Sequence, residues 1–599
     1  MKNLFKNIIF LILSICFFTQ CQNKNQQPIS EDLGSVKSEI LKINNDFKQQ
    51  TTKLIELVKK NSNENQVQNQ FDQLRYTYKK MEWAIEYFLP HTARFMNGPA
   101  LPEIEFEEHN ALDPEGLQVI EELLYSHQDK NKDEIIRNLK KLLNKSGTIK
   151  TNFETISINK NQVFDALRQQ VFRISSLGIS GFDTPISGNH LKEIPYSLES
   201  IKYFFKLISH KPHNESFENI TSIINRAKTT LEKNTNKDTF DYADFTINIL
   251  NPLAKEVLKF KKEEGIKNIE VTKAINSDAE TFYSKNAFNP NAYVSGKKFE
   301  FSTEKANLGK QLFSDNLLSK NNDRSCTTCH IPEKAFTDGR EKSLSLKGSP
   351  LSRNTPSLNY SAFQQNQFWD MRQADLEGQS SDVITNKEEM HGDLETILAK
   401  INNHPEYSKT FKKIYKTDKV ETWQLQNALA TYIRSLPKFN SNFDDFMRGN
   451  KNVITENQKQ GFNLFVGKAK CATCHFLPLF NGSVPPNFTK TEQEVLGTAE
   501  NSNNKKLDSD LGRGKFHATL ESLQHSFKTP TLRNINKTAP YMHNGGYKTL
   551  QEVMDFYNKG GGKGLGFKIE NQTLPEDHLN LTNKEINQII DFMKSLDDK

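Results

Sequence analysis

The sequence predicts a mainly α-helical protein, in which an N-terminal helical bundle is followed by two smaller helical domains. Three observations lead to this prediction. Apolar residues recur at helical spacing through the N-terminal half, and no long stretch alternates apolar and polar residues as a half-buried strand would. The C-terminal half holds two copies of a Cys-x-x-Cys-His motif. With 599 residues the chain is long enough for three or four domains.

The chain starts with a segment typical of exported bacterial proteins. A short positive region precedes an apolar run at residues 8–18, which is too short for an ordinary transmembrane helix. The sequence then turns abruptly polar around Cys21. We predict that residues 1–21 form a lipoprotein signal, that Cys21 carries a lipid anchor, and that the protein is periplasmic or lies in the cell envelope. An ordinary cleaved secretion signal is the alternative, because Gln20 stands where lipoprotein signals carry a small residue.

Residues 22–285 are expected to form the N-terminal helical domain and a linker. The clearest helix carries a continuous apolar stripe whose members lie three or four residues apart: Phe71, Leu74, Tyr78, Met81, Ile85 and Phe88. It should end at Leu89, because a proline follows and the residue before a proline avoids helical geometry. Two further stripes, at residues 164–174 and 198–208, favour a helical bundle. A polar stretch rich in Lys and Asn, near residues 228–300, should contain the linker.

The two Cys-x-x-Cys-His motifs are Cys326-Thr-Thr-Cys329-His330 and Cys471-Ala-Thr-Cys474-His475. This pattern is the attachment site for a c-type haem, in which both thiols bond to the porphyrin and the adjacent His binds the iron. A thioredoxin-like pair or a zinc site is the alternative. Zinc would require both cysteine pairs to converge on one metal, and it would leave the two His residues unexplained. We therefore predict two covalently bound haem c groups.

The other two cysteines, Cys16 and Cys21, lie in the export segment, so that none remains for a structural disulfide. We expect two haem domains, each mainly helical as cytochrome c-like domains are. The first should span residues 286–450 and the second residues 451–599. Three capping boxes in the second domain predict where helices begin, at Thr455, Thr549 and Thr582.

Seven further motifs occur in order around the two haem motifs: Leu308-Gly-Lys-Gln-Leu-Phe313, Ala335-Phe-Thr-Asp-Gly-Arg340, Arg353-Asn354-Thr-Pro-Ser-Leu358, Phe368-Trp369-Asp370-Met-Arg372, Glu389-Met390, Phe527-Lys-Thr-Pro-Thr-Leu-Arg-Asn534 and Ala539-Pro-Tyr-Met-His543. With these motifs, the chain from about Leu308 to its end resembles the bacterial dihaem cytochrome c peroxidase family, including its MauG-type branch. The resemblance implies an enzyme that reduces hydrogen peroxide at the first haem and takes electrons through the second.

The resemblance assigns three residues to the chemistry. Glu389 matches the catalytic glutamate, which would take a proton from one peroxide oxygen and deliver one to the other. Gln379 matches the glutamine of the distal pocket. Trp369 matches the tryptophan between the two haems, where a large π-system suits electron transfer. The structural alternatives are an exposed helix residue for Glu389 and core packing for Trp369.

The axial ligands of the iron determine whether a haem can bind peroxide or serves in electron transfer. His330 and His475 are the proximal ligands. Many members of the family carry a second His, before the Arg-Asn-x-Pro motif, that closes the first haem until the other haem is reduced. Positions 343–352 hold no His in this chain, so the first haem should be open without reductive activation.

The sixth ligand of the second haem is a Met in other members and a tyrosinate in MauG-type members. Tyrosinate is a hard anionic donor that favours oxidised iron, whereas a thioether favours the reduced state. Tyr557 occupies the matching position, and Met554 on the same helix face is the second candidate. Packing is the alternative role of both side chains.

The resemblance also implies a calcium ion between the haem domains, bound by the side-chain oxygen of Asn354 and the backbone carbonyls of Thr538 and Pro540. Oxygen-only ligation suits this hard cation. The alternative is that these residues only form turns, which Asn and Pro favour.

The segment Gly116-Leu-Gln118-Val-Ile-Glu121-Glu122, with the preceding helix around Glu82 and Trp83, resembles imelysin-like helical domains of exported bacterial proteins. That family carries Gly-x-His-x-x-Glu at this place, associated with an iron-related function. Gln118 replaces the His in this chain. We therefore expect Glu121 and Glu122 to lie on a solvated helix face, and the domain to be a docking or structural module.

The leading prediction is an exported dihaem peroxidase that reduces hydrogen peroxide with electrons from a small redox protein, a cytochrome c or a cupredoxin. A MauG-type enzyme that oxidises residues of a protein partner is the alternative, favoured by Tyr557 and the missing His. A non-catalytic electron-transfer or iron- and haem-handling lipoprotein is an alternative of another class, against which Glu389 and Gln379 argue. A net charge of +6, with no basic stretch interleaved with aromatic residues, gives no sign of nucleic-acid binding.

Overall fold

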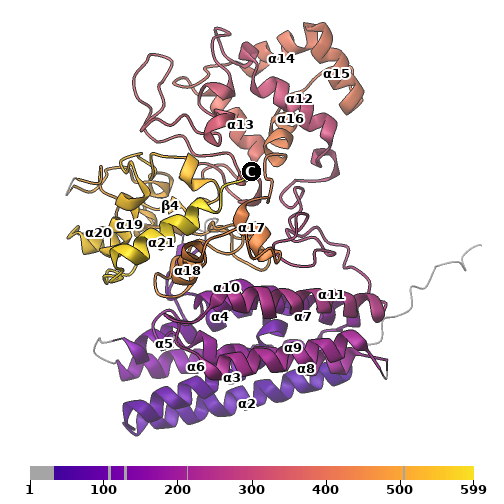
Figure 1. The fold of residues 1–599 in the computed structure, drawn as a ribbon, viewed down its shortest axis with the longest axis vertical. Helices are drawn as coiled ribbons and strands as arrows, with labels where there is room; N and C mark the ends of the chain where they lie inside the picture. Colours follow the sequence, from indigo (N-terminus) through magenta and orange to yellow (C-terminus); the bar gives the residue numbers. More distant parts are fainter. Residues whose placement is uncertain (1–32, 106–109, 127–130, 212, 504–505) are drawn as a thin grey trace, which may run out of the picture.

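The structure, a computed structural model, describes residues 33–105, 110–126, 131–211, 213–503 and 506–599. The predicted signal at residues 1–21 lies outside them. The described chain is mainly α-helical, as predicted (Figure 1). Its strands form two short antiparallel pairs: β1 (Glu103–Glu105) with β2 (Asn110–Leu112), and β3 (Gln493–Glu494) with β4 (Phe527–Lys528). None of the helices described is both long enough and apolar enough to cross a membrane.

The N-terminal half is a bundle of antiparallel and crossing helices: α2 (Gly34–Lys59), α3 (Glu64–Phe88), α4 (Pro90–Asn97), α5 (Leu117–Tyr125), α6 (Lys132–Thr155), α7 (Lys160–Arg173), α8 (His190–Ile208), α9 (Glu215–Lys233), α10 (Tyr242–Phe245) and α11 (Asn251–Glu263). The predicted stripe lies on α3, where its first five members are buried and Phe88 is half-buried. The helix ends at Leu89 as predicted, and the next one begins at Pro90. π-Helical turns, η1 (Ile174–Gly178) and η2 (Thr246–Leu250), extend α7 and α10.

The stretch expected to contain the linker is more helical than its polar composition suggested. α10, η2 and α11 fill residues 242–263, because apolar side chains such as Leu250, Leu253 and Val257 recur there at helical spacing and are buried. Irregular chain, interrupted by the 3₁₀ turn η3 (Lys297–Phe299), occupies residues 264–302.

The region of the first haem motif contains five helices: α12 (Thr303–Phe313), α13 (Leu376–Thr385), α14 (Leu394–Asn403), α15 (Pro405–Tyr415) and α16 (Thr422–Arg434). α12 packs closely on α16 at Gly309, where a Cβ atom would lie 1.9 Å from the carbonyl oxygen of Ala428. Only glycine permits this approach of the two backbones. This close approach of the backbones explains why the motif that begins at Leu308 has a glycine as its second residue.

The region of the second haem motif repeats this arrangement. Its helices are α17 (Asn442–Met447), α18 (Glu456–Val466), α19 (Leu550–Asn558), α20 (Gly561–Gly564) and α21 (Asn583–Lys594). α18 packs on α21 at Gly461, whose Cβ position lies 1.9 Å from the carbonyl oxygen of Gln588. All three predicted capping boxes are present, at the starts of α18, α19 and α21.

One apolar core runs through the bundle and the second haem region, whereas α12 to α16 enclose a separate core. Within this shared core, aromatic contacts join the bundle to the second haem region. Phe172 of α7 stacks on Phe282 with ring centroids 4.4 Å apart, and Phe282 meets Phe488 edge to face at 6.0 Å. Phe288 stacks on Phe439 at 5.3 Å. In Figure 1, α17 and α18 accordingly lie directly on the bundle, and α12 to α16 lie at the far end of the molecule.

Candidate functional site

The two haem motifs adopt the same backbone conformation. Each begins with a 3₁₀ turn, η5 (Cys326–Thr328) or η8 (Cys471–Thr473). The backbone N–H of His330 donates to the carbonyl oxygen of Cys326 at 2.9 Å, and that of His475 donates to Cys471 at 2.9 Å. None of these four cysteines forms a disulfide. Each turn therefore holds two thiols and one imidazole on a short, regular segment.

The proximal histidines are oriented by backbone carbonyls. His330 Nδ1 lies 2.9 Å from the carbonyl oxygen of Phe336, and His475 Nδ1 lies 3.2 Å from those of Phe480 and Pro530. An Nδ1–H that donates to a carbonyl leaves Nε2 unprotonated and able to bind iron. Burial lowers the pKa of both imidazoles, that of His475 to about 4, which keeps them neutral. The donor set at each motif thus fits a covalently bound haem c.

Glu389 lies beside the first motif. It sits in the turn after α13, where its Oε1 accepts a hydrogen bond from Asn386 Nδ2 at 2.7 Å. Burial raises the pKa of the Glu389 carboxyl, and the positive charge of Arg372 opposes the shift. Burial also raises the pKa of the Cys329 thiol, and the charge of Glu389 contributes to that shift. The carboxyl group is therefore close enough to the first motif to act on it electrostatically. Gln379 is half-buried on the preceding α13.

The segment at residues 343–352, which contains no histidine, packs against the turn that carries Glu389. Residues 343–351 form a narrow loop closed by a bridge between Leu344 and Pro350. Arg324 Nη2 donates to the carbonyl oxygen of Leu344 in this loop at 2.8 Å. Its Nη1 lies 3.4 Å from the carbonyl oxygen of Glu389, so that one guanidinium contacts both the loop and the turn. Leu346 N donates to the carbonyl oxygen of Glu388 at 2.9 Å. The loop at residues 343–351 thus lies against the turn that carries Glu389.

Trp369 lies where the two haem regions meet. Its Nε1 donates to the carbonyl oxygen of Asn354 at 3.0 Å, and its own carbonyl oxygen accepts from Lys528 N of β4 at 2.8 Å. Asn354 N in turn donates to the carbonyl oxygen of His543 at 2.8 Å. Three of the motifs found in the sequence, far apart along the chain, therefore meet around this indole.

Charged residues near Trp369 reinforce the junction. Arg353 pairs with Asp370 at 2.5 Å and with Asp510 at 2.6 Å. The guanidinium also lies 5.5 Å above the ring of Phe527, which stacks on His543 with centroids 3.7 Å apart. Sequence reasoning found Arg353, Phe527 and His543 only as parts of motifs. It missed Asp510, because no motif surrounds that residue.

Of the residues assigned to calcium, Asn354 is bonded to the segment that follows Thr538 and Pro540. The hydrogen bond from Asn354 N to His543 brings Asn354 beside the chain that follows Thr538 and Pro540. Asn354 Nδ2 donates to the carbonyl oxygen of Arg340 at 2.9 Å, which fixes the orientation of the amide. No cluster of three or more His, Cys, Asp or Glu side chains suited to a metal ion occurs in the described part of the chain. The calcium assignment uses amide and carbonyl oxygens instead.

Tyr557 faces the second motif. Burial raises the pKa of the Tyr557 hydroxyl above its ordinary value, and the charges of Cys474 and Cys471 contribute to the shift. Met554, on the same helix α19, is buried in the core shared with the bundle. Tyr557 therefore lies within electrostatic range of the second motif, and Met554 belongs to the core against which Cys471 packs.

Glu121 contradicts its prediction. It is fully buried, and the N–H and hydroxyl of Ser187 donate to its Oε1 at 2.8 and 2.6 Å. Burial raises the pKa of Glu121 to about 7. The prediction of a solvated face was wrong because Gly116, with φ of 108°, lets α5 start so close to α4 that a Cβ atom there would lie 2.7 Å from the carbonyl oxygen of Met96. This close packing turns the face of Glu121 inwards. Glu122 is exposed, as predicted.

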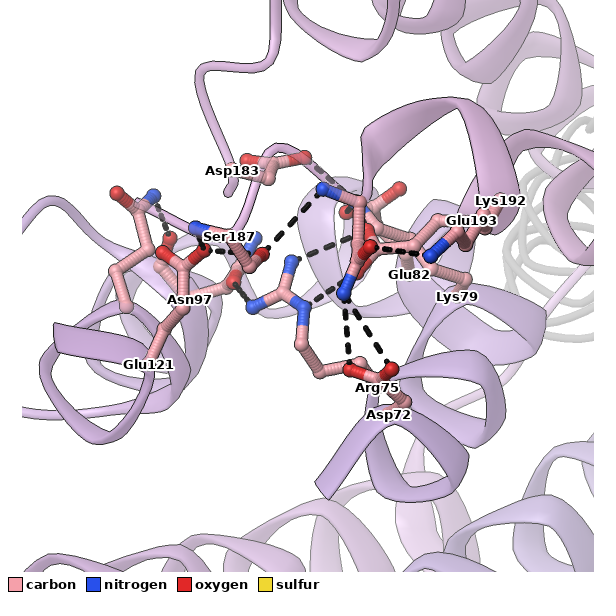
Figure 2. Close-up of polar contacts among 12 residues, drawn as sticks. Asp72, Arg75, Lys79, Glu82, Asn97, Glu121, Asp183, Ser187, Lys192 and Glu193 are labelled. Carbon is pink, nitrogen blue, oxygen red and sulfur yellow. Dashed lines mark hydrogen bonds and ion pairs between the residues drawn. The ribbon is translucent and has the colours of Figure 1, made fainter. Parts of the chain in front are cut away.

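Figure 2 shows that Glu121 borders a larger buried network in the bundle. Arg75 pairs with Glu193, and Lys79 pairs with Glu82 at 2.6 Å and with Asp183 at 2.5 Å. Every one of these side chains is at most 5 % exposed. Removal of one partner would leave a buried charge uncompensated, so the network fixes how α3, α8 and the loop after α7 pack.

The bundle also covers the chain that leads into the second haem motif. Lys470 Nζ donates to the carbonyl oxygen of Pro185 at 2.8 Å, and Phe182 meets Phe476 edge to face at 5.5 Å. Gly467 lies against the backbone of Lys237. No sequence signal predicted these contacts, because they join segments more than 200 residues apart.

Comparisons with known proteins identify the family of the chain. The family model of di-haem cytochrome c peroxidase matches residues 303–452. Cytochrome-c peroxidase IdrP2 of Denitromonas iodatirespirans is 34% identical over 273 residues, covering 43% of this chain and 74% of the relative. Methylamine utilization protein MauG of Methylorubrum extorquens is 31% identical over 309 residues, covering 51% and 82%. Cytochrome c551 peroxidase of Nitrosomonas europaea is 31% identical over 296 residues, covering 49% and 80%.

Among solved structures, a MauG-like protein associated with microbial copper homeostasis is 27% identical, with a TM-score of 0.44, and the match covers 50% of this chain and 91% of that one. The relatives' sequences are matched over most of their length by about half of this chain. The chain belongs to the di-haem cytochrome c peroxidase family.

Proposed function

We propose that this chain reduces hydrogen peroxide at the haem held by His330, with electrons that pass through the haem held by His475. Because the chain belongs to the di-haem cytochrome c peroxidase family, it is an oxidoreductase of the peroxidase type with two haem c groups. The observation that supports a role for Glu389 is its contact with Arg324, two residues before the first motif, whose guanidinium lies 3.4 Å from the carbonyl oxygen of Glu389. A buried carboxyl also lies beside the second motif, where Glu494 interacts with Cys474 and burial raises the pKa of Glu494 to about 7. The division of roles between the two haems therefore rests on the family resemblance.

Glu389 supplies the proton chemistry. Reduction of peroxide consumes two electrons and two protons and yields two water molecules. The haem, when bound, supplies the redox chemistry. The carboxylate takes the proton from the near oxygen and delivers it to the departing one, which avoids a hydroxide leaving group. Burial raises the pKa of Glu389 and so makes proton uptake easier, while Asn386 holds Oε1 in place. Gln379 and Trp369 are proposed as the distal-pocket amide and the bridge for electrons.

The test is steady-state turnover of peroxide with an artificial electron donor. Glu389→Gln keeps the shape of the side chain but removes its ability to carry a proton, and it should lower turnover by roughly 10²- to 10⁴-fold. Glu388→Gln is the matched control, because Glu388 is the exposed neighbour in the same turn. Unchanged turnover in Glu389→Gln would remove Glu389 from the mechanism.

A second candidate function is MauG-type oxidation of residues on a protein partner. Two observations favour it. The loop at residues 343–351 reaches the side of Glu389 without a histidine, so the first haem is proposed to react in the fully oxidised protein. Tyr557 is proposed as the sixth ligand of the second haem, and a tyrosinate there would stabilise oxidising equivalents. Stopped-flow absorption after peroxide is added without a reductant separates the two functions. A long-lived oxidised species favours the MauG-type function.

Further proposals concern the rest of the molecule. The electron donor is a small redox protein such as a cytochrome c or a cupredoxin, and it is replaced by a protein substrate in the MauG-type function. The protein is proposed to be periplasmic or in the cell envelope, anchored through lipid on Cys21. A calcium ion is proposed to bind Asn354 and the carbonyls of Thr538 and Pro540. The bundle is proposed to be an imelysin-like module.

A further inference from the structure

The bundle places a tyrosine directly against the chain that leads into the second haem motif. Tyr242, the first residue of α10, is fully buried. A Cβ atom on Gly467 would lie 2.9 Å from its Cε2, so the phenol ring touches the backbone four residues before Cys471. Nearby, Ala243 N donates to Asn463 Oδ1 of α18 at 2.9 Å, which holds the start of α10 on the second haem region.

A histidine lies within hydrogen-bonding distance of this phenol. His190 Nε2, at the start of α8, is 3.2 Å from the hydroxyl oxygen of Tyr242, and the two rings lie nearly parallel. The hydroxyl also donates to the carbonyl oxygen of Lys237 at 3.0 Å, so its single proton has two possible acceptors, this carbonyl and the imidazole. Burial lowers the pKa of His190 to about 3, and the positive charges of Lys237 and Lys470 add to the shift. The imidazole is therefore neutral, and one of its nitrogens has a lone pair available.

This arrangement is the one that oxidation of a tyrosine requires. A phenol loses an electron readily only if its proton can leave at the same time, because the phenol radical cation is a very strong acid. A carbonyl oxygen such as that of Lys237 is too weak a base to take up this proton. A neutral imidazole, even with its lowered pKa, is a much stronger base than the phenol radical cation. The negative charge of Asp183 partly offsets the charge that His190 would then gain.

We propose that Tyr242 and His190 form a proton-coupled relay that carries single electrons between the second haem and the surface of the bundle. The inference rests on the proposed function, which supplies the oxidant as peroxide. Tyr242 gives one electron to the oxidised haem site, its O–H bond breaks, and the proton moves to His190 Nε2. A neutral tyrosyl radical and an imidazolium result. An electron from an outside donor then restores the phenolate oxygen, and His190 returns the proton.

The position of the pair suits such a relay. On one side Tyr242 touches Gly467, and on the other it lies beneath the loop at residues 234–239, where Asn236, Asp238 and Thr239 are exposed. The electron donor would then dock over this loop, because the bundle covers the chain around Lys470.

The chain offers a matched control. Tyr283 is also buried and also touches the second haem region, with its ring 6.1 Å from that of Phe443. Its hydroxyl has no hydrogen-bond partner among the described residues. It lacks the proton acceptor that Tyr242 has, so it should not form a stable radical.

The experiment is electron paramagnetic resonance of the haem-loaded protein, frozen after peroxide is added without a donor. A tyrosyl signal is expected in the wild type and in Tyr283→Phe, and it should be lost in Tyr242→Phe. In His190→Gln the signal should form at least tenfold more slowly and lose its solvent deuterium isotope effect. A signal that persists in Tyr242→Phe, or no signal in the wild type while haem absorption responds to peroxide, would overturn the relay.

A photochemical oxidant separates the relay from the proposed function. If haem absorption does not respond to peroxide, the proposed function fails, and the relay is tested by flash oxidation of the haem-loaded protein with a ruthenium photosensitiser. Formation of a tyrosyl radical that depends on Tyr242 and His190 supports the relay in that case. A radical that forms equally in Tyr242→Phe refutes it.

Discussion

Replacement of Gly467 with alanine tests whether close backbone contact holds the bundle on the second haem region. The new Cβ atom would lie 2.3 Å from the carbonyl oxygen of Lys237, and 3.4 Å is where ordinary contact begins. A backbone oxygen cannot rotate away, so the two segments must separate by about 1 Å. Overpacking of this kind costs about 1–3 kcal/mol. Since every 1.4 kcal/mol is a factor of ten, opening of the contact should become about 5- to 140-fold more frequent.

The assay is hydrogen–deuterium exchange followed by mass spectrometry on the haem-loaded protein. Peptides that cover residues 234–245 and 463–471 should exchange faster in Gly467→Ala, while peptides from α12 and α16 should be unaffected because they belong to the separate core. Gly147→Ala is the control, since Gly147 lies on α6 with no neighbouring atom within 4 Å of its Cβ position. Equal exchange in Gly467→Ala and the wild type would refute the reasoning.

Three further predictions concern other parts of the molecule. Asp444→Asn should lower the free energy of unfolding by about 3–5 kcal/mol, because Arg533 and Asp444 are both fully buried and bonded at 2.8 and 2.9 Å; an unchanged urea midpoint would contradict this. The folded-state pKa of Glu121, about 7, exceeds the ordinary 4.5, so its contribution to stability falls as pH rises from about 4.5 to about 7. Glu121→Gln should flatten the pH dependence of the melting temperature in that range, and the exposed Glu232→Gln should not. Tyr557→Met should raise the midpoint potential of the second haem in a spectroelectrochemical titration, whereas Met554→Leu should leave it unchanged; equal potentials in Tyr557→Met and the wild type would exclude Tyr557 as a ligand.

Sequence reasoning succeeded where structure is determined locally. The capping boxes at Thr455, Thr549 and Thr582 each start a helix, because the cap and its partner lie within one turn. The apolar stripe on α3 predicted both the helix and its buried face, and Pro90 marked its end. The haem motifs could be recognised because attachment needs two thiols and an imidazole at fixed spacing.

Tertiary contacts explain what the sequence could not show. Glu121 and Glu122 are adjacent and chemically identical, and only the packing of α5 against α4 decides that the first is buried and the second exposed. The Tyr242–His190 pair joins residues on two helices with no motif around either. The position of Trp369 at the junction was suggested by its motif, but its partners, Asn354 and Lys528, come from segments that only folding brings together.

The continuous core of the bundle and the second haem region limits how the molecule can be divided. Phe282 and Phe288 lie before residue 303, where the family match begins, yet their rings contact Phe488 and Phe439 of the haem-binding half. A truncated chain that begins near residue 300 would present those aromatic side chains to water as one apolar patch. Such a fragment, although it retains both haem motifs, should self-associate more readily than the full chain, so the irregular segment at residues 264–302 is part of the haem-binding half as a packing unit.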